Sequence, residues 1–321
     1  MKSPVSRRKA LTGLGAIAGL SLLPLSALAE QEKKKKSPSP KANIFTYCLN
    51  TSTIMGQNLG IEEEINITAK AGYDGIEIWI RSLEAYVEKG GKLKDLKKRI
   101  DDSGLKVEDA IGFAQWIVDD NDTRSRALEQ AKREMDMLAQ VGCKRLAAPP
   151  AGATNYPGLD LDKAAERFRA LVELGAQMGV NPQLEVWGFS KNLYKLSQVL
   201  YVAAECGHPN TRILPDIYHL YRGGSDIDGL KLISGETIEV FHMNDYPKDL
   251  NYMDIQDKDR IYPGLGVAPT TQILKDLAAS GKPKVLSLEL FNRDYWAQDA
   301  LEVAKKGLAQ MKEAVRKAME G

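Results

Sequence analysis

The sequence has few of the residues that define several common classes of protein. Its 321 residues include three cysteines and three histidines, and aromatic residues make up 7% of the chain. Cys48, Cys143 and Cys206 are too few and too far apart for a disulfide framework or a cysteine-based zinc cluster. We therefore expect the three cysteines to be small buried residues.

The sequence also lacks an excess of charge of one sign. Of its 44 basic residues, four lie within the first 29 positions, which leaves 40 basic against 43 acidic residues in the remainder. A surface this close to neutral does not provide the basic patch that nucleic-acid binding requires. We expect no nucleic-acid partner.

Residues 1–29 have the organisation of an export signal. Basic residues precede an apolar run, Ala10–Leu28, and Ala27-Leu-Ala29 supplies the small residues of a cleavage site. The segment around Arg7 and Arg8 resembles the twin-arginine export signal of bacteria. An ordinary secretory signal that contains two arginines is the alternative. Either signal predicts a periplasmic or secreted protein.

A stable membrane anchor is not expected at this end of the chain. The apolar run is short and is interrupted by Pro24, and no cysteine follows it to carry a lipid. Residues 30–42 are rich in lysine, serine and proline and have nothing to bury, so we expect a disordered linker. The folded domain should then span residues 43–321.

From residue 43 onward, amphipathic helices alternate with apolar strands. Each helix is expected to close on a glycine, at Gly72, Gly104, Gly142, Gly179, Gly207, Gly235 and Gly281. The expected strands are Ile44–Leu49, Gly75–Ile80, Leu105–Gly112, Lys144–Pro149, Gln183–Trp187, Arg212–Ile217, Ile238–Asn244 and Val285–Leu290. Eight strands alternating with helices predict an α/β fold, the (β/α)8 TIM barrel.

A doubly wound open sheet shows the same alternation of strands and helices. Two features favour the barrel. The first strand is followed by Cys48-Leu-Asn-Thr-Ser-Thr53 and not by a glycine-rich phosphate-binding turn. Polar residues also collect at the C-terminal ends of the last four strands, where barrel enzymes place their active sites.

These polar residues interrupt otherwise apolar strand ends. They are Glu185, Asp216, His219, His242 and Glu289. A carboxylate in an apolar strand is costly to bury unless it is paired or bound to a metal. Three carboxylates brought to one place would repel one another, so the pattern predicts a divalent metal site.

The order of these residues along the chain resembles a known family. It runs Glu185, Asp216-x-x-His219, His242-x-x-Asp245, Arg260-x-x-Pro-Gly-x-Gly266 and Glu289. The set is similar to that of the xylose-isomerase-like barrels, the sugar isomerase and epimerase group. Gly72-Tyr-Asp-Gly-Ile-Glu-Ile78 and Asp259-Arg-Ile-Tyr-Pro-Gly-Leu-Gly266 are also typical of that group. The resemblance extends from about Asn43 to the last helix.

The resemblance implies a metal, a substrate class and a set of roles. It places the metal ligands at Glu185, Asp216, His242 and Glu289, a set of oxygen and nitrogen donors that suits one divalent ion of Mn, Mg, Co or Zn. It makes Glu185 and Glu289 the pair that transfers protons. The implied reaction is the isomerisation or epimerisation of a keto-sugar or related polyol through an enediolate.

The resemblance also suggests residues that contact the substrate, with alternatives that the sequence leaves open. His219 and Arg260 would lie near the substrate oxygens, although His219 could instead bond to Asp216 and Arg260 could pair with a nearby aspartate. Trp187 is one of four tryptophans near strand ends, and it could stack on the sugar or fill the core. Glu77 could reach the site or pair with an arginine. Asp245 is expected behind the site, where it would hold His242 or Arg260.

The chain departs from the family pattern in its histidines. Trp187 stands where many relatives have a histidine, and with His208 assigned to the opposite end of the barrel only His219 and His242 remain. Two histidines are too few for the three zinc ions of the DNA-repair branch of this superfold. Two other functions stay open: a dehydratase or lyase acting on keto-sugars or inososes, and a non-catalytic sugar binder. The sequence is also compatible with a homo-oligomer.

Overall fold

The computed structural model describes residues 44–320, and eight strands recur along this part of the chain. The predicted signal peptide and linker, residues 1–29 and 30–42, lie outside the described residues. The strands are β1 (Phe45–Asn50), β2 (Gly75–Trp79), β3 (Lys106–Ile111), β4 (Arg145–Ala148), β5 (Asn181–Glu185), β6 (Arg212–Leu214), β7 (Val240–Met243) and β8 (Lys284–Leu288).

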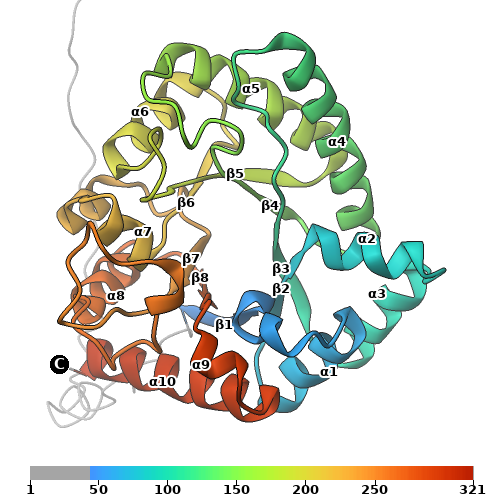
Figure 1. Ribbon diagram of the computed structural model, residues 1–321, viewed down its shortest axis with the longest axis vertical. Helices are drawn as coiled ribbons and strands as arrows, with labels where there is room; N and C mark the ends of the chain where they lie inside the picture. The colour runs from blue at the N-terminus through green and yellow to red at the C-terminus, as the bar shows by residue number, and fades with distance from the viewer. Residues whose placement is uncertain (1–43, 321) are drawn as a thin grey trace, which may run out of the picture. The chain divides into compact units, whose positions relative to one another are not determined.

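The strands form one parallel sheet in the order β6-β5-β4-β3-β2-β1-β8-β7. Its two edge strands meet through isolated parallel bridges, Ile213 to Ile238 and Asp216 to His242. These bridges bring the edges together into a nearly closed barrel, and the helices form a layer outside it (Figure 1). The predicted (β/α)8 barrel is confirmed, and the open doubly wound sheet is excluded.

Helices connect the strands on the outside of the barrel. The α-helices are α1 (Ile61–Ala71), α2 (Ile80–Glu88), α3 (Leu93–Asp102), α4 (Asn121–Gln140), α5 (Leu161–Met178), α6 (Leu196–Cys206), α7 (Ile217–Arg222), α8 (Thr270–Ala279), α9 (Arg293–Trp296) and α10 (Ala300–Glu320). Three short 3₁₀ helices add to them: η3 (Thr51–Gln57), η4 (Ile227–Leu232) and η5 (Asp257–Asp259). Among the described residues, no helix is both long enough and apolar enough to cross a membrane.

Most of the predicted closing glycines end their helices as expected. Gly72 and Gly179, for example, follow α1 and α5 in the left-handed conformation, with φ of 89° and 72°. Gly235 is an exception, because the element before it is the 3₁₀ helix η4 and its φ is not positive. There a glycine is needed for close packing, since a Cβ would lie 2.8 Å from the Cβ of Ser280.

The sixth strand is shorter than the sequence predicts. It ends at Leu214, and the chain turns at Pro215 into α7. Asp216 forms the N-cap of that helix, and its side chain accepts a hydrogen bond from the backbone N–H of His219. The turn places Asp216 at the end of the barrel strand and His219 on the first turn of the helix.

Two separate sets of apolar side chains fill the protein. The larger lies between the strands and the helices. The smaller takes one residue from each of seven strands: Cys48, Trp79, Ile111, Ala147, Leu214, Val240 and Val285. Because alternate strand residues of a barrel point inward, we assign this set to the barrel interior. All three cysteines are buried and free, as expected.

Candidate metal centre

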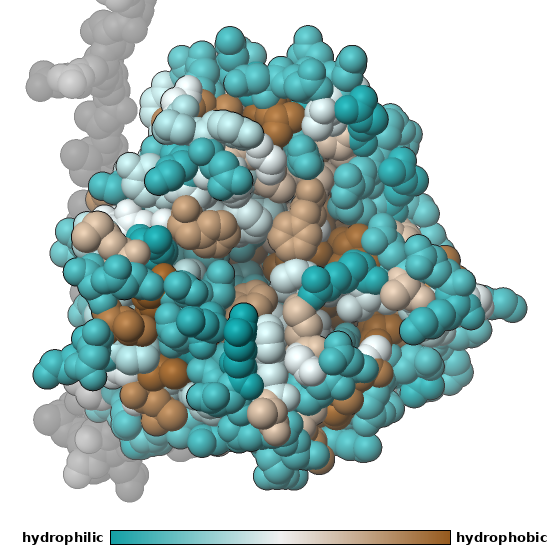
Figure 2. All heavy atoms as spheres, viewed as in Figure 1, coloured by the Kyte–Doolittle hydropathy of each residue, from teal (hydrophilic) through white to brown (hydrophobic). Residues whose placement is uncertain are grey.

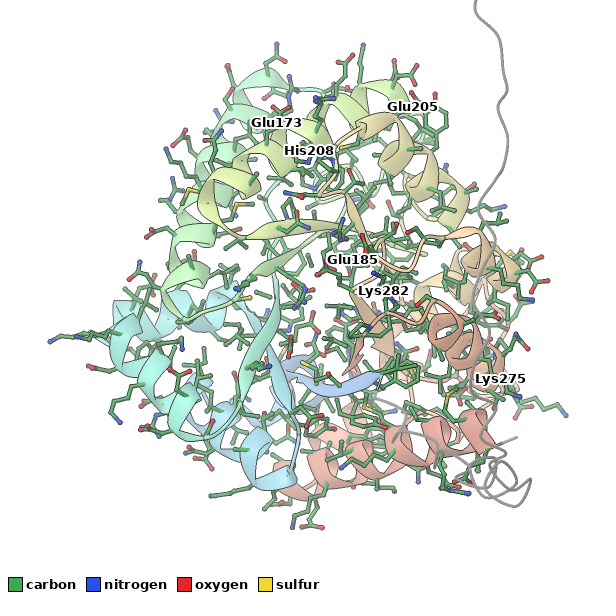
Figure 3. The ribbon with its side chains drawn as sticks, turned by 180° about the vertical axis from the view of Figure 1, so that it is seen from behind. Glu173, Glu185, Glu205, His208, Lys275 and Lys282 are labelled. Atoms are coloured by element: carbon green, nitrogen blue, oxygen red, sulfur yellow. The ribbon has the colours of Figure 1, made fainter. Side chains whose placement is uncertain are left out.

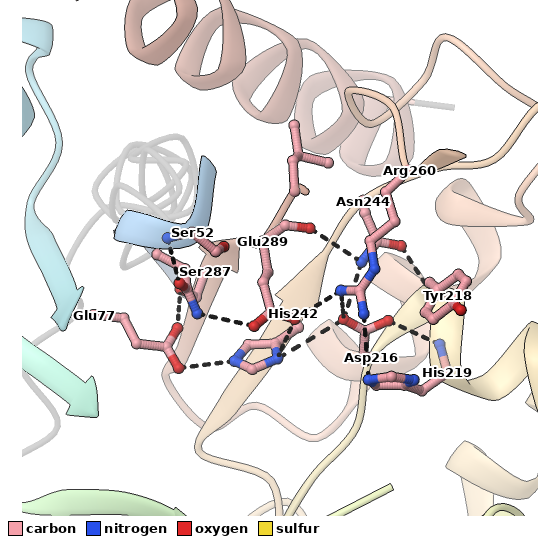
Figure 4. Close-up of polar contacts among 12 residues, drawn as sticks. Ser52, Glu77, Asp216, Tyr218, His219, His242, Asn244, Arg260, Ser287 and Glu289 are labelled. Atoms are coloured by element: carbon pink, nitrogen blue, oxygen red, sulfur yellow. Dashed lines mark hydrogen bonds and ion pairs between the residues drawn. The ribbon is translucent and has the colours of Figure 1, made fainter. Parts of the chain in front are cut away.

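The ends of three neighbouring strands bring two carboxylates and an imidazole together. Asp216 follows β6, His242 lies within β7 and Glu289 follows β8. Each offers one potential ligand atom, and the three atoms lie within 4.8 Å of one another. All three residues are buried, with Asp216 and His242 fully inaccessible to solvent. Figure 4 shows their side chains converging.

His242 provides the test of whether a metal would fit. Its Nε2 lies 2.9 Å from Oε1 of Glu77. Its Nδ1 has no hydrogen-bond partner among the described residues, although it lies 3.2 Å from Oε2 of Glu289 and 3.8 Å from Oδ2 of Asp216. A buried ring nitrogen without a partner is rare in proteins. The Nδ1 atom of His242 lies near two carboxylate oxygens. One nitrogen together with two oxygens is a donor set that divalent ions such as Mn, Mg, Co and Zn bind.

Glu185 occupies the last position of β5, beside β6, and is buried. Its carboxylate is not part of the group whose ligand atoms lie within 4.8 Å of one another. Figure 3, which views the barrel from behind, shows Glu185 near the centre of the barrel and His208 farther from it. Burial raises the pKa of Glu185 well above its ordinary value, although His242 opposes the effect.

Arg260 is buried against the two carboxylates. Its Nη1 donates to Oδ2 of Asp216 at 3.0 Å and to Oε2 of Glu289 at 2.7 Å. Its Nη2 donates to Oδ1 of Asp257 at 2.6 Å, so it both pairs with a nearby aspartate and enters the site. Only 1% of the residue is exposed, and its guanidinium lies 4.2 Å from the centre of the Tyr218 ring.

The remaining carboxylates of the site differ in pKa because their neighbours differ. Burial raises the pKa of Asp216 to about 6, with Arg260 acting in the opposite direction. Burial also acts to raise the pKa of Glu289, but His242 and Arg260 outweigh it and the pKa falls below its ordinary value. Glu289 and Glu77 in turn raise the pKa of His242 well above its ordinary value, against the effect of burial.

His219 and Glu77 lie on opposite sides of the three-residue group. His219 is buried, with Nε2 3.3 Å from Nη2 of Arg260, and burial and Arg260 both lower its pKa well below the ordinary value. Its imidazole is therefore neutral. Glu77 lies behind His242, where one oxygen meets Nε2 and the other accepts a hydrogen bond from the hydroxyl of Ser287. A carboxylate in this position orients a metal-binding histidine.

Asp245 holds the backbone of the segment that carries Arg260. Its carboxylate accepts hydrogen bonds from the backbone N–H groups of Tyr246, Gly264, Gly266 and Ala268. The backbones of Asp245 and Ile261 also pair in an antiparallel bridge. Gly266 has to be a glycine, because a Cβ would lie 2.1 Å from the carbonyl oxygen of Tyr246. Asp245 therefore acts on Arg260 through the main chain.

Trp187 lies at the rim of the site and is partly exposed. Its ring centre is 5.0 Å from that of Phe189 and 6.1 Å from that of Phe113. The tryptophan therefore belongs to a group of aromatic side chains around the opening, a position compatible with stacking on a ligand.

Two asparagines of the site were not predicted from the sequence. The side-chain amide of Asn50 donates to Oε1 of Glu289 at 3.1 Å, and that of Asn244 donates to Oδ2 of Asp216 at 2.9 Å. Each fixes the orientation of one carboxylate. Asn50 ends β1 and Asn244 follows β7, so the signal was the same polar residue at a strand end that identified the others.

Comparison with known proteins places this geometry in a family. A model described as xylose isomerase-like TIM barrel matches residues 65–314. The chain belongs to this family. It is 26% identical over 268 residues to an inosose isomerase of Bacillus velezensis, a match that covers 81% of this chain and 94% of the relative.

Two further matches are to a second curated relative and to a solved structure. A 3-dehydroshikimate dehydratase of Pseudomonas aeruginosa is 26% identical over 260 residues, which cover 78% of this chain but only 39% of that longer protein. Among solved structures, the IOLI protein crystallised with a zinc atom superposes with a TM-score of 0.78 at 23% identity, covering 85% of this chain and 99% of the other. At that identity the likeness shows the fold alone. Isomerases and a dehydratase are therefore among the relatives.

Proposed function

We propose that this protein is a metal-dependent isomerase or epimerase of a keto-sugar or related polyol. Asp216, His242 and Glu289 would hold the metal, with Glu185 as the fourth ligand. The observation that carries the proposal is the buried Nδ1 of His242, which faces two carboxylates and has no hydrogen-bond partner among the described residues. When bound, a divalent ion supplies positive charge to the substrate oxygen on which negative charge develops.

Glu185 and Glu289 are the pair that we propose to transfer the proton. They come from β5 and β8, with β6 and β7 between them in the barrel, so they approach the opening from different strands. One carboxylate can take the proton from the carbon next to the carbonyl, and the other can return a proton to the resulting enediolate. Asn50 supports this role by holding one oxygen of Glu289.

Arg260 and His219 would bind the substrate oxygens. The Nε of Arg260 is buried and has no hydrogen-bond partner among the described residues, and the neutral His219 lies next to the guanidinium. Glu77, which bonds to His242 and Ser287, would orient the imidazole and not contact the substrate. Trp187 would pack against the substrate at the rim.

Metal analysis and hydrogen exchange test the proposal together. The purified protein should contain about one divalent ion per chain. In D₂O, at least one sugar of a keto-sugar panel should gain deuterium at the carbon next to its carbonyl group. Removal of the ion with a chelator should abolish the incorporation, and adding the ion back should restore it. A protein that binds no divalent ion, or a metal-loaded protein that exchanges no proton in any keto-sugar, would refute the proposal.

A dehydratase acting on a related substrate is the second candidate. It is supported by the 3-dehydroshikimate dehydratase among the relatives. Both reactions begin with removal of a proton next to a carbonyl, after which a dehydratase expels a β-hydroxyl group and an isomerase reprotonates the carbon. The same panel separates them, because loss of water from the substrate indicates the dehydratase and deuterium in recovered substrate or isomer indicates the isomerase.

We also propose that the protein is exported as a folded chain through a twin-arginine signal at residues 1–29. A chain that folds before export binds its metal in the cytoplasm and not in the periplasm. The compartment matters because the affinity of such sites favours Cu²⁺ and Zn²⁺ over Mn²⁺ and Mg²⁺. Replacing Arg7 and Arg8 with lysine should leave a folded precursor inside the cell. Cell fractionation tests this, and mature protein outside the cytoplasm in a strain without the twin-arginine translocase would contradict it.

A further inference from the structure

Aromatic side chains surround the opening of the barrel above the candidate metal centre. They follow the C-terminal ends of four strands, since Trp79 ends β2 and the others lie two to four residues beyond β3, β5 and β8. We call this group the aromatic collar: Trp79, Phe113, Trp187, Phe189 and Phe291. In Figure 2, apolar side chains gather around the hollow at the middle of this face.

The collar is continuous from ring to ring. The ring centres of Trp79 and Phe113 are 5.4 Å apart, and those of Phe113 and Trp187 are 6.1 Å apart. Trp187 lies 5.0 Å from Phe189, and Trp79 lies 6.1 Å from Phe291. These spacings are those of interacting aromatic pairs. The contacts also follow the order of the strands from β8 through β2 and β3 to β5, so the collar covers that side of the opening.

His219 and Arg260 close the gap in the collar on the side of β6 and β7. The ring centre of Phe189 is 5.5 Å from that of His219, whose Nε2 is 3.3 Å from Arg260. The guanidinium of Arg260 lies 5.0 Å from the ring centre of Phe291. Arg260 also bonds to Asp216 and Glu289. The collar is thus directly connected to the metal centre below it.

The outer part of the collar has little capacity to bind hydroxyl groups. Phe113 and Phe189 are each 40% exposed, and a phenyl ring offers no hydrogen-bond donor or acceptor. The indole N–H of Trp79 is already donated to Asn50. A bare sugar can place the C–H face of its ring on an aromatic side chain, but its outward hydroxyl groups find no hydrogen-bond partner on Phe113 and Phe189. An apolar ring would instead bury its surface against Phe113 and Phe189.

We infer that the substrate of this site is a sugar that carries an apolar ring, such as an aryl substituent, and that the aromatic collar binds this ring. The inference rests on the proposed function, because it extends the substrate class of the same site. Phe113 and Phe189 are the residues that select for the substituent, while Asp216, His242, Glu289 and Arg260 bind the sugar end. The collar lies around the hollow on this face of the barrel (Figure 2), and a hollow fits a small ligand better than a flat protein surface does.

The test compares two keto-sugars that differ only in the substituent on one oxygen. 1-O-phenyl-D-fructose and 1-O-methyl-D-fructose, which both keep the carbonyl group at C2, are titrated against the full-length, metal-loaded protein, and binding is followed by tryptophan fluorescence or ligand-observed NMR. We expect the phenyl compound to bind about tenfold more tightly. The double variant Phe113→Ser/Phe189→Ser should reduce this ratio to below about threefold. Tyr156→Ser is the matched control, because Tyr156 is an aromatic residue outside the collar and is 74% exposed; it should keep the full ratio.

Equal affinity for the phenyl and methyl keto-sugars would overturn the inference, as would a ratio that survives in the double variant. Sedimentation velocity provides a third outcome. If the wild type forms a dimer that the double variant loses, the collar is an interface between copies of this chain and the inference is wrong. Circular dichroism and metal content of the double variant should match the wild type, which shows that the exposed substitutions leave the barrel and its centre intact.

Deuterium exchange distinguishes failure of this inference from failure of the proposed function. If bare keto-sugars exchange their protons while the phenyl and methyl keto-sugars bind equally, the function stands and the inference falls. If no keto-sugar exchanges but the phenyl preference is present and is lost in the double variant, the proposed function falls and the ring specificity of the collar stands.

Discussion

The two ends of the barrel both carry clusters of charged side chains, but the clusters are built differently. At the N-terminal end, Glu239 accepts hydrogen bonds from the Nε atoms of Arg145 and Arg212 at 2.6 and 2.7 Å. Arg145 also pairs with Glu108 at 3.1 Å. These two arginines and two glutamates balance in charge, and between 11% and 32% of each side chain is exposed.

At the C-terminal end the charges do not balance and no solvent reaches most of them. Four carboxylates, those of Glu77, Glu185, Asp216 and Glu289, surround the site, against Arg260 and the imidazole of His242. One buried ring nitrogen of His242 has no hydrogen-bond partner among the described residues. Paired charges at a surface contribute to folding, whereas a buried set with excess negative charge is suited to binding a cation. The comparison indicates that the charges at the N-terminal end are satisfied by their own pairs, whereas the charges at the C-terminal end are suited to a cation.

Removing a ligand at the C-terminal end should have the largest effect. Asp216→Asn and His242→Ala should each lose bound metal, and activity should fall by at least about a thousandfold, or about 4 kcal/mol of barrier. Inductively coupled plasma mass spectrometry and the exchange assay measure the two losses. Circular dichroism should show a folded barrel in both variants. Full metal occupancy in both would show that these residues are not ligands.

Changing the proposed proton acceptor should separate catalysis from metal binding. Glu289→Gln keeps an oxygen for the metal but cannot accept a proton, so kcat should fall by about a hundredfold or more, and more than metal affinity falls. The measurement is kcat with saturating metal beside a metal titration. If activity stays within about tenfold of the wild type, or about 1.4 kcal/mol, Glu289 acts as a ligand only.

The residue behind His242 should have a smaller effect on the same centre. Glu77→Gln keeps the shape of the side chain but removes the charge that orients the imidazole. Metal affinity should therefore fall by about 10–100-fold, the usual cost of losing a carboxylate behind a metal-binding histidine. Chelator competition measures this change. Ser287→Ala is the partial control, because it removes the hydroxyl that donates to Glu77 but leaves the carboxylate in place. An unchanged metal affinity in Glu77→Gln would contradict the role of Glu77 in orienting His242.

The smallest effect is expected at the N-terminal end, on stability and not on metal. Glu239→Gln leaves Arg145 and Arg212 without their shared carboxylate, which should cost about 1–2 kcal/mol after allowance for the partial exposure of the three side chains. Although burial opposes it, the bonds to the two arginines lower the pKa of Glu239 below 4.5. The contribution of Glu239 to the free energy of unfolding is therefore present above pH 4.5. It is lost as the pH falls through the lower pKa that Glu239 has in the folded protein.

Urea denaturation at two pH values tests this prediction. At pH 7 the variant should be less stable than the wild type, and well below pH 4 the difference should shrink as Glu239 becomes protonated in the wild type. Metal content at pH 7 should be unchanged. Loss of metal in Glu239→Gln would show that the two ends of the barrel are coupled.

The sequence by itself determined the alternation of strands and helices and the residues at the strand ends. Both follow from local rules, since apolar runs separated by glycine-terminated helices have few other ways to fold. Asp216, His242 and Glu289 could be found because each interrupts an apolar strand end, where a polar side chain has an evident cost. The same rule could have identified Asn50 and Asn244, which were overlooked because an amide costs less to bury than a charge.

Only the tertiary structure decided how these residues face one another. Glu77 lies 165 positions from His242 in the chain, and whether it meets the imidazole or the substrate depends on the stagger of β2 against β7 around the barrel. Arg260 reaches the site on the segment after β7, which Asp245 holds by accepting hydrogen bonds from the backbone N–H groups of Gly264, Gly266 and Ala268. The aromatic collar joins residues from four strand ends, and its closure depends on the barrel's curvature. Local sequence patterns encode which residues stand at the end of each strand. The distances between the strand ends are set by the closure of the whole sheet.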